Sequence, residues 1–208
     1  MYYYFQIDSQ SDFDNIRQLV EGRTFSSKIF INIRKDILFE GTFKPIDASN
    51  FDVTINGNNH TLTGLRVNHV GYDRDELDNT GMFSSVNSLE VHDLNVENSY
   101  IYGGVKCGTF AGHVENDVLL DQVTLDDVIV NSEAFCGGAV GRCANLNVFN
   151  CDFYVSVYGH DVVGGVAGMA NKFTEENNNI DAKGISIGKA IGNETGYCDI
   201  RLKRNHNI

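Results

Sequence analysis

Short apolar segments that alternate with polar residues recur through the middle of the chain. They lie at residues 94–96, 123–125, 151–153 and 180–182, and again at 100–102, 128–130, 155–157 and 185–187. Alternation in a strand directs one set of side chains inward and the other outward. Because no segment is long enough to form a core alone, the pattern predicts short strands that stack on one another.

A glycine-led repeat frames these segments. Gly81, Gly108, Gly138 and Gly165 begin the stretches GMFSS, GTFAG, GAVGR and GVAGM, at spacings of 27, 30 and 27 residues. A fixed period of this length is typical of solenoid proteins. Since glycine adopts positive φ at little cost, we expect these glycines at a sharp corner that recurs in every coil.

Together these patterns predict an all-β fold, a right-handed parallel β-helix. Coils stack about 4.8 Å apart, so equivalent apolar residues should form ladders, one of them from Leu94, Val123 and Cys151. Residues 28–41 and 51–67 are predicted to form earlier, less regular coils, which gives about six coils in all. A helical solenoid would need long amphipathic runs of period 3.6, and the repeats contain none.

The segment SDFDNIRQLVEG at residues 11–22 predicts one short helix. Ser11 is the candidate N-cap, Asp14 follows three residues later, and Gly22 is expected to end the helix. The open end of a solenoid must be covered, and the helix offers an apolar face that could do so. That face comprises Phe13, Ile16 and Val20.

We therefore expect a single domain with three parts. Residues 1–27 form an N-terminal cap that contains the helix, residues 28–188 form the coils, and residues 189–208 form a C-terminal cap or tail. A length of 208 residues suits one domain, because coils add along one axis without enlarging a globular core.

Several of these motifs together resemble a known family. NGNNHTLTGL at 56–65, GMFSSV at 81–86, GGAVGR at 137–142 and GGVAGM at 164–169 resemble the segments of GLUG-type repeat proteins. The resemblance covers roughly residues 28–188 and implies a right-handed parallel β-helix of the pectin-lyase-like fold. Many members of that family are secreted or attached to surfaces, whereas this sequence shows no export signal.

Composition agrees with such a domain. Hydrophobic residues make up 42% of the chain and charged residues 21%, with 21 glycines and a single proline. No signal peptide or membrane-spanning segment is recognisable, so a cytoplasmic location is expected. An odd number of cysteines with no CxxC pair predicts free buried thiols, with no metal or cofactor. The cysteines are Cys107, Cys136, Cys143, Cys151 and Cys198.

Charge is distributed unevenly along the chain. Residues 71–181 carry 18 acidic and four basic side chains, a net charge of −14, while the whole chain carries −12. Such a field attracts basic protein surfaces and repels nucleic acids and membranes. We predict a non-enzymatic interaction protein whose acidic flank binds a basic protein. The candidate binding residues are Asp73, Asp75, Glu76, Asp78, Glu90, Asp93, Glu97, Glu115, Asp117, Asp121, Asp126 and Asp127.

One specific form of this hypothesis is an inhibitor that mimics a nucleic acid, for example a phage-encoded protein directed against a host defence system. Stacked coils repeat carboxylates about every 4.8 Å, within the range of phosphate spacings along a strand. The basic partner would then be a nucleic-acid-binding enzyme. The sequence leaves the oligomeric state open, a homodimer included.

Two other functions stay open: a β-helix that binds or cleaves carbohydrate, and a structural module of the cell surface. Polygalacturonase-type β-helices carry acidic, histidine and arginine motifs on one face. This chain has partial counterparts at 79–80 (Asn-Thr), 126–127 (Asp-Asp), 159–161 (Gly-His-Asp) and 201–203 (Arg-Leu-Lys). Each counterpart is incomplete or displaced within the repeat, so we assign no catalytic residue.

Overall fold

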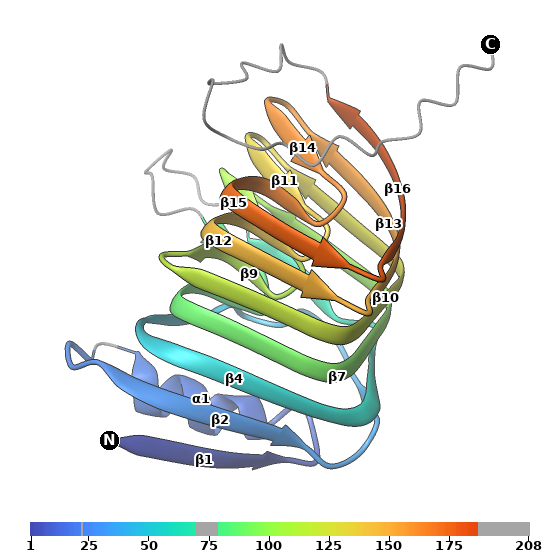
Figure 1. Ribbon diagram of the computed structural model, residues 1–208. Helices are drawn as coiled ribbons and strands as arrows, with labels where there is room; N and C mark the ends of the chain where they lie inside the picture. The colour runs from blue at the N-terminus through green and yellow to red at the C-terminus, as the bar shows by residue number, and fades with distance from the viewer. Residues whose placement is uncertain (22, 70–78, 187–208) are drawn as a thin grey trace, which may run out of the picture.

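The protein is a parallel β-solenoid of about six turns (Figure 1). The structure, a computed structural model, describes residues 1–21, 23–69 and 79–186. Strands stack along one axis, and the described part of the chain contains one helix, α1 (Asp12–Val20). The prediction of an all-β parallel solenoid with a single short helix is therefore confirmed.

Twelve strands form one continuous sheet, and four short strands form a second. All their pairings are parallel, because each coil repeats the path of the coil before it. The large sheet comprises β1 (Tyr2–Ile7), β2 (Ser27–Ile33), β3 (Ile37–Leu38), β4 (Ile46–Thr63), β5 (Arg66–His69), β7 (Phe83–Gly103), β9 (Ala111–Val114), β10 (Asp117–Ser132), β12 (Val140–Phe149), β13 (Asp152–Gly159), β15 (Ala167–Glu176) and β16 (Asn179–Ser186). The second sheet comprises β6 (Asn79–Thr80), β8 (Lys106–Cys107), β11 (Phe135–Gly137) and β14 (Val162–Gly164).

The large sheet bends at two corners and so presents three outer faces. The first face stacks residues 2–7, 27–33, 51–56, 88–92, 117–121, 145–149 and 172–176. The second face stacks residues 37–38, 62–63, 94–97, 123–126, 152–154 and 179–181. The third face stacks residues 66–69, 100–103, 128–131, 155–159 and 182–186.

The corner between the first and second faces is built by residues with positive φ. Asp93, Gln122, Asn150 and Asn177 occupy equivalent places in successive coils, with φ between 50° and 57°. Asn and Asp tolerate this left-handed conformation better than most residues, because their short polar side chains can bond locally. The chain therefore turns here through polar residues.

The repeat glycines have a different role from the expected one. Gly81, Gly108, Gly138 and Gly165 do not have positive φ; among the described glycines only Gly41 and Gly64 do. The prediction of left-handed repeat glycines is thus wrong. A Cβ on Gly108 would lie 2.4 Å from the Val140 Cα of the next coil, so glycine is needed there for close approach of two backbones.

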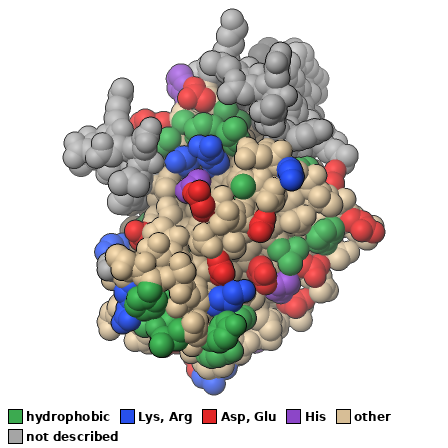
Figure 2. Space-filling model, turned by 60° about the vertical axis from the view of Figure 1, so that its left-hand side comes forward, with side chains coloured by type: hydrophobic (Ala, Val, Ile, Leu, Met, Phe, Trp, Pro, Cys, Tyr) green, Lys and Arg blue, Asp and Glu red, His purple; other side chains and the backbone are tan. Residues whose placement is uncertain are grey.

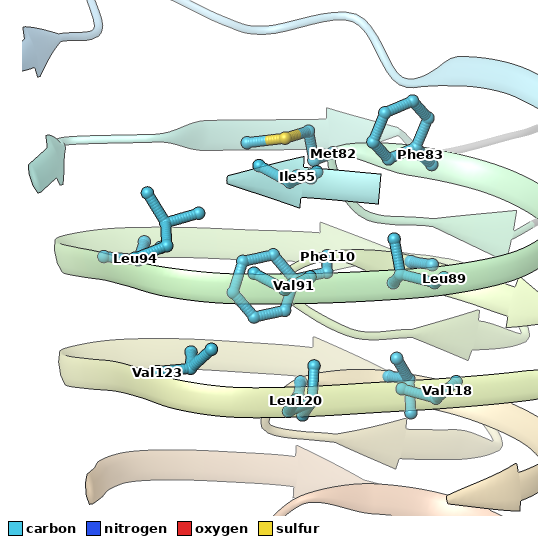
Figure 3. Packing of buried hydrophobic residues seen from close by; sticks show 14 of the residues in the cluster. Ile55, Met82, Phe83, Leu89, Val91, Leu94, Phe110, Val118, Leu120 and Val123 are labelled. Atoms are coloured by element: carbon cyan, nitrogen blue, oxygen red, sulfur yellow. The ribbon is translucent and has the colours of Figure 1, made fainter. Parts of the chain in front are cut away.

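Apolar ladders fill the interior. Leu94 pairs with Val123, and Val91 with Leu120, and the four side chains are fully buried (Figure 3). Cys151 is also fully buried. Strand pairing places Asp152 opposite Thr124, so the residues before them, Cys151 and Val123, are aligned. The predicted ladder of Leu94, Val123 and Cys151 is therefore confirmed.

Helix α1 packs against the N-terminal end of the core, as expected. Phe13 and Ile16 are 0% exposed and Val20 is 2% exposed. The Phe13 ring meets Phe43 edge-on, with ring centroids 5.6 Å apart. Aromatic contacts of this geometry add to the hydrophobic gain of burial.

The predicted side-chain cap at the start of the helix does not form, and an acidic side chain instead braces the turn before the helix. Ser11 makes no side-chain capping hydrogen bond. Instead, the Asp12 carboxylate accepts the backbone N–H groups of Asp8 and Ser9, each at 2.9 Å. These bonds lower the pKa of Asp12. The predicted helix end at Gly22 and the predicted tail at 189–208 lie outside the described residues.

Candidate interaction surfaces

A column of outward side chains runs along the second face. Strand pairing places Glu97 opposite Asp126, Asp126 opposite Tyr154, and Tyr154 opposite Asp181. Outward residues of adjacent strands lie about 5 Å apart, so these four side chains form one continuous strip. Asp126 and Asp181 are exposed, and Tyr154 is 43% exposed.

The adjacent column strengthens the negative potential of this face. It stacks Asn95, Thr124, Asp152 and Asn179. Neither column contains Lys or Arg, so the carboxylates here have no cation aligned with them. The Asn179 amide donates a hydrogen bond to the Tyr154 hydroxyl at 2.8 Å, which fixes the ring between the carboxylates.

Tyrosines lie beside this strip, across the second corner. On the third face, Tyr100 and Tyr102 stack with parallel rings, with centroids 6.4 Å apart. Tyr100 is 41% exposed and Tyr158 is 37% exposed. Asp127 forms the corner itself, as an extra residue between the strand segments that end at Asp126 and begin at Val128.

We call this region the acidic–tyrosine surface. Carboxylates and aromatic ring faces both attract ammonium and guanidinium groups, the first by charge and the second by the ring quadrupole. The surface can therefore hold cationic side chains without any chemical step. It comprises Glu97, Asp126, Asp127, Asp152, Asp181, Tyr100, Tyr102, Tyr154 and Tyr158.

A second feature is a groove of about 460 Å³ on the first face. Three carboxylates, Asp52, Glu90 and Asp117, line it together with the apolar side chains of Leu119 and Phe149. We call it the first-face groove. Polar groups around a partly apolar floor are typical of small-ligand sites.

Neighbouring side chains hold these carboxylates in place. The Asn87 amide donates to Asp52 at 2.6 Å, and the Asn145 amide donates to Asp117 at 2.7 Å. The Lys28 ammonium lies 3.9 Å from the Asp52 carboxylate. The groove is therefore less negative than the acidic–tyrosine surface, since one of its carboxylates has a cation beside it.

The acidic residues predicted to form one flank lie on several faces. Glu97 and Asp126 lie on the second face, whereas Glu90 and Asp117 line the first-face groove. Glu115 lies outside both surfaces and bonds His113 at 3.2 Å. The structure thus brings together only part of the predicted set. Four of its members, Asp73, Asp75, Glu76 and Asp78, lie outside the described residues.

Three of the predicted residues have a structural role at corners. Asp93 and Asp127 both have a φ of 50°, a conformation that Asp accepts more readily than most residues. Asp121 accepts a hydrogen bond at 3.1 Å from Asn150, the corner residue of the next coil. The turn of the chain is therefore a structural reason for an Asp at each of these three positions, apart from any role in binding.

Sequence reasoning missed Asp152, Asp181 and the tyrosines of this surface. Each lies at an outward position of an alternating segment, so the signal was present in the pattern. The sequence did not show how successive coils align, and this alignment places Asp181 in the same column as Asp126.

The partial polygalacturonase-like motifs are dispersed. Asn79 is buried in β6 of the four-stranded sheet. Asp126 points outward from β10 of the large sheet, and His160 follows the last residue of β13. The fourth motif, at 201–203, lies outside the described residues. Within the described ranges, no group of three or more His, Cys, Asp or Glu side chains could hold a metal ion. Nor does that part of the chain contain a helix long and apolar enough to cross a membrane.

Charge also varies along the solenoid axis. Residues 1–69 carry eight acidic and seven basic side chains, whereas residues 79–186 carry 14 acidic and four basic ones. Figure 2 shows one side of the molecule, with acidic side chains scattered over its middle and several basic and hydrophobic side chains toward the lower, N-terminal end. The N-terminal coils are thus nearly neutral, and the later coils carry the negative field.

The described cysteines are buried and form no disulfide, as predicted. Burial raises the pKa of Cys136 and of Cys143 to about 12, and that of Cys151 to about 11. A thiol must lose its proton to act as a nucleophile, so these groups pack as apolar side chains. Cys198 lies outside the described residues.

Comparison with known proteins supports the fold alone. No protein-family profile and no curated protein matches the chain, so the GLUG-type resemblance is not confirmed. The chain is similar in structure to a Bacteroides ovatus protein that carries the provisional name immunoglobulin A1 protease. They are 13% identical with a TM-score of 0.52, and the match covers 89% of this chain and 66% of that one. Likeness at this level transfers no activity.

Proposed function

We propose that this protein binds a cationic segment of another protein through its acidic–tyrosine surface and performs no chemical step there. The observation that supports the proposal is the column of Glu97, Asp126, Tyr154 and Asp181, beside a second column that also lacks Lys and Arg. Glu97 and Asp126, about 5 Å apart along the axis, match the reach of basic side chains on an extended peptide or a helix. The tyrosines add cation–π contacts, which favour arginine.

The proposal has a specific electrostatic consequence. A negative strip on a low-dielectric surface attracts a cationic partner from a distance and speeds association. Binding should weaken steeply as salt is added, because the Debye length falls to about 10 Å at 0.1 M. Mimicry of a nucleic acid is the less favoured form of this function, since Tyr154 interrupts the column of carboxylates. Proteolysis is no part of the proposal, because the likeness to the Bacteroides ovatus protein carries only the fold.

The test uses nona-arginine as the probe and two matched double variants. Glu97→Gln with Asp126→Asn removes two charges from the column, while Glu115→Gln with Glu133→Gln removes two exposed charges elsewhere. Fluorescence anisotropy with the labelled peptide should show the first variant weakened about tenfold or more, as hydrogen bonds to charged groups contribute about 1.5–3 kcal/mol each. The second variant should change less than about threefold.

Equal weakening of the two variants would contradict the proposal, because binding would then depend on net charge alone. Tyr154→Ala separates the role of the ring from that of the carboxylates. It should cost several-fold in affinity and leave the salt dependence nearly unchanged, since it removes no charge.

Carbohydrate binding in the first-face groove is the second candidate function. The observation that favours it is the pairing of an apolar floor, from Leu119 and Phe149, with fixed carboxylates that accept hydrogen bonds from sugar hydroxyls. Calorimetric titration with a panel of neutral oligosaccharides tests it. Phe149→Ala should abolish any binding seen, whereas Glu97→Gln should leave it unchanged.

A further inference from the structure

The first strand of the solenoid has one hydrogen-bonded edge and one free edge. β1 pairs with β2 in parallel over all of its residues, Tyr2 to Ile7. No other strand in the described part of the chain pairs with β1. The sequence did not predict this strand, because its aromatic run does not alternate clearly.

The direction of the free backbone groups follows from the pairing. The Lys28 N–H donates to the Met1 carbonyl at 3.3 Å, and the Arg34 N–H donates to the Ile7 carbonyl at 3.0 Å. In a parallel pair, only every second residue directs its backbone N–H and C=O toward the neighbouring strand. Since the Met1 and Ile7 carbonyls both accept bonds from that side, the backbone groups of Tyr3, Phe5 and Ile7 point toward β2. The N–H and C=O groups of the remaining residues, Tyr2, Tyr4 and Gln6, therefore point away from the solenoid.

Nothing in the sequence of this edge prevents further pairing. Natural sheets protect free edges with proline, charged side chains or bulges, and residues 2–7 contain none of these. Tyr2 is 62% exposed and Tyr4 is 71% exposed. The Tyr4 ring stacks on Phe30 with centroids 5.0 Å apart, which extends an apolar surface along the edge.

We infer that β1 is a dimerisation edge that pairs antiparallel with β1 of a second copy of this chain. A two-fold axis through Tyr4 places Tyr4 opposite its equivalent, and Tyr2 opposite Gln6 of the other copy. This register is self-complementary, because it brings each outward-pointing residue opposite another outward-pointing residue. The three such residues in each copy then supply six N–H donors and six C=O acceptors, and all of them are satisfied.

The charge distribution favours a second copy as the occupant of this edge. The strand carries no charged side chain, and the N-terminal coils hold eight acidic and seven basic residues. The later coils carry a strong negative field, so two copies repel least when their N-terminal ends meet. A cationic partner, by contrast, would be drawn to the acidic–tyrosine surface.

Sedimentation velocity and light scattering of the 208-residue protein test the inference. A 23.0 kDa monomer should convert to a species of twice that mass. The conversion should occur as the concentration rises from about 1 µM to about 100 µM, because a six-residue edge gives a small interface. A monomer throughout, or masses that keep growing beyond the dimer, would overturn the two-fold arrangement.

Substitutions at Tyr4 test the register. Tyr4→Pro removes an N–H that points away from β2, so the β1–β2 pairing survives while dimers are lost. Tyr4→Thr keeps the N–H and should still dimerise.

A charge exchange gives an independent test if the proline variant proves unstable. Tyr4→Lys alone and Tyr4→Glu alone should each be monomeric, since like charges would face each other across the axis. An equimolar mixture of the two should recover the dimer. Failure of the mixture to dimerise, when the unsubstituted protein does, would exclude the Tyr4-centred register.

Discussion

Replacement of Gly108 by alanine should destabilise the solenoid severely, although the change adds one methyl group. The new Cβ would lie 2.4 Å from the Val140 Cα and 2.6 Å from the Ala139 carbonyl oxygen, both backbone atoms of the next coil. Neither atom can move alone, so the two coils must separate by about 1 Å at this point. Hydrogen bonds between the coils would lengthen, among them the bond of 2.9 Å from the Phe110 N–H to the Ala139 carbonyl.

The expected loss follows from these two effects. Overpacking of a tight interior costs about 1–3 kcal/mol, and weakening of two backbone hydrogen bonds adds about 1–2 kcal/mol. A total of about 2–5 kcal/mol is a large part of the stability of a domain of this size. Urea unfolding followed by far-UV circular dichroism measures it.

Gly41→Ala is the matched control. Gly41 has a φ of +72° and no atom within 4 Å of an added Cβ. Its replacement should cost about 1–2 kcal/mol, the usual penalty of a left-handed conformation. If Gly108→Ala were as mild as Gly41→Ala, close approach of the coils would not be the reason for the repeat glycines.

Three further outcomes are expected. Phe13→Ala should lower the free energy of unfolding by about 3–5 kcal/mol, because its fully buried ring covers the first coil; a change below about 1 kcal/mol would show that α1 is no cap. Cys136, Cys143 and Cys151 should react with a thiol reagent only after unfolding, and rapid labelling of the native protein would contradict their raised pKa values. Burial lowers the pKa of His113 below its ordinary 6.5, so the unfolded chain binds more protons than the folded protein below that pH. The free energy of unfolding should therefore have its full value above pH 6.5 and decrease as the pH falls through the pKa of the folded state. His113→Gln should reduce that slope, as measured by urea unfolding across this pH range, and an unchanged slope would assign it to other groups.

The alternation of residues and the glycine repeat were sufficient to predict the coil. Both signals are local: an inward residue is apolar wherever it lies, and a period of 27 to 30 residues repeats with the path of the chain. The ladder of Leu94 and Val123 follows directly from them. The covering face of α1 follows equally from its helical spacing. The missing side-chain bond of Ser11 could not be predicted, because it depends on the conformation of the turn between β1 and α1.

The outward faces could not be predicted in the same way. Solvent accepts many residue types, so an exposed position leaves little trace in the pattern. Whether Asp126 stands opposite Tyr154 depends on the register between coils. One extra residue, Asp127, shifts that register between Asp126 and Val128. The acidic residues that the sequence concentrates in residues 71–181 therefore lie on several faces of the solenoid.

What the sequence by itself determined is the repeated coil and the side of each strand that faces the core. The tertiary structure alone decided which coils align, which carboxylates and tyrosines share a column, and why the repeat glycines are needed. The physical reason is that burial is a property of one residue, whereas a column or a close backbone contact exists only between coils. Asp126 and Asp181 are far apart in the chain and share a column because the intervening coil places Tyr154 opposite both.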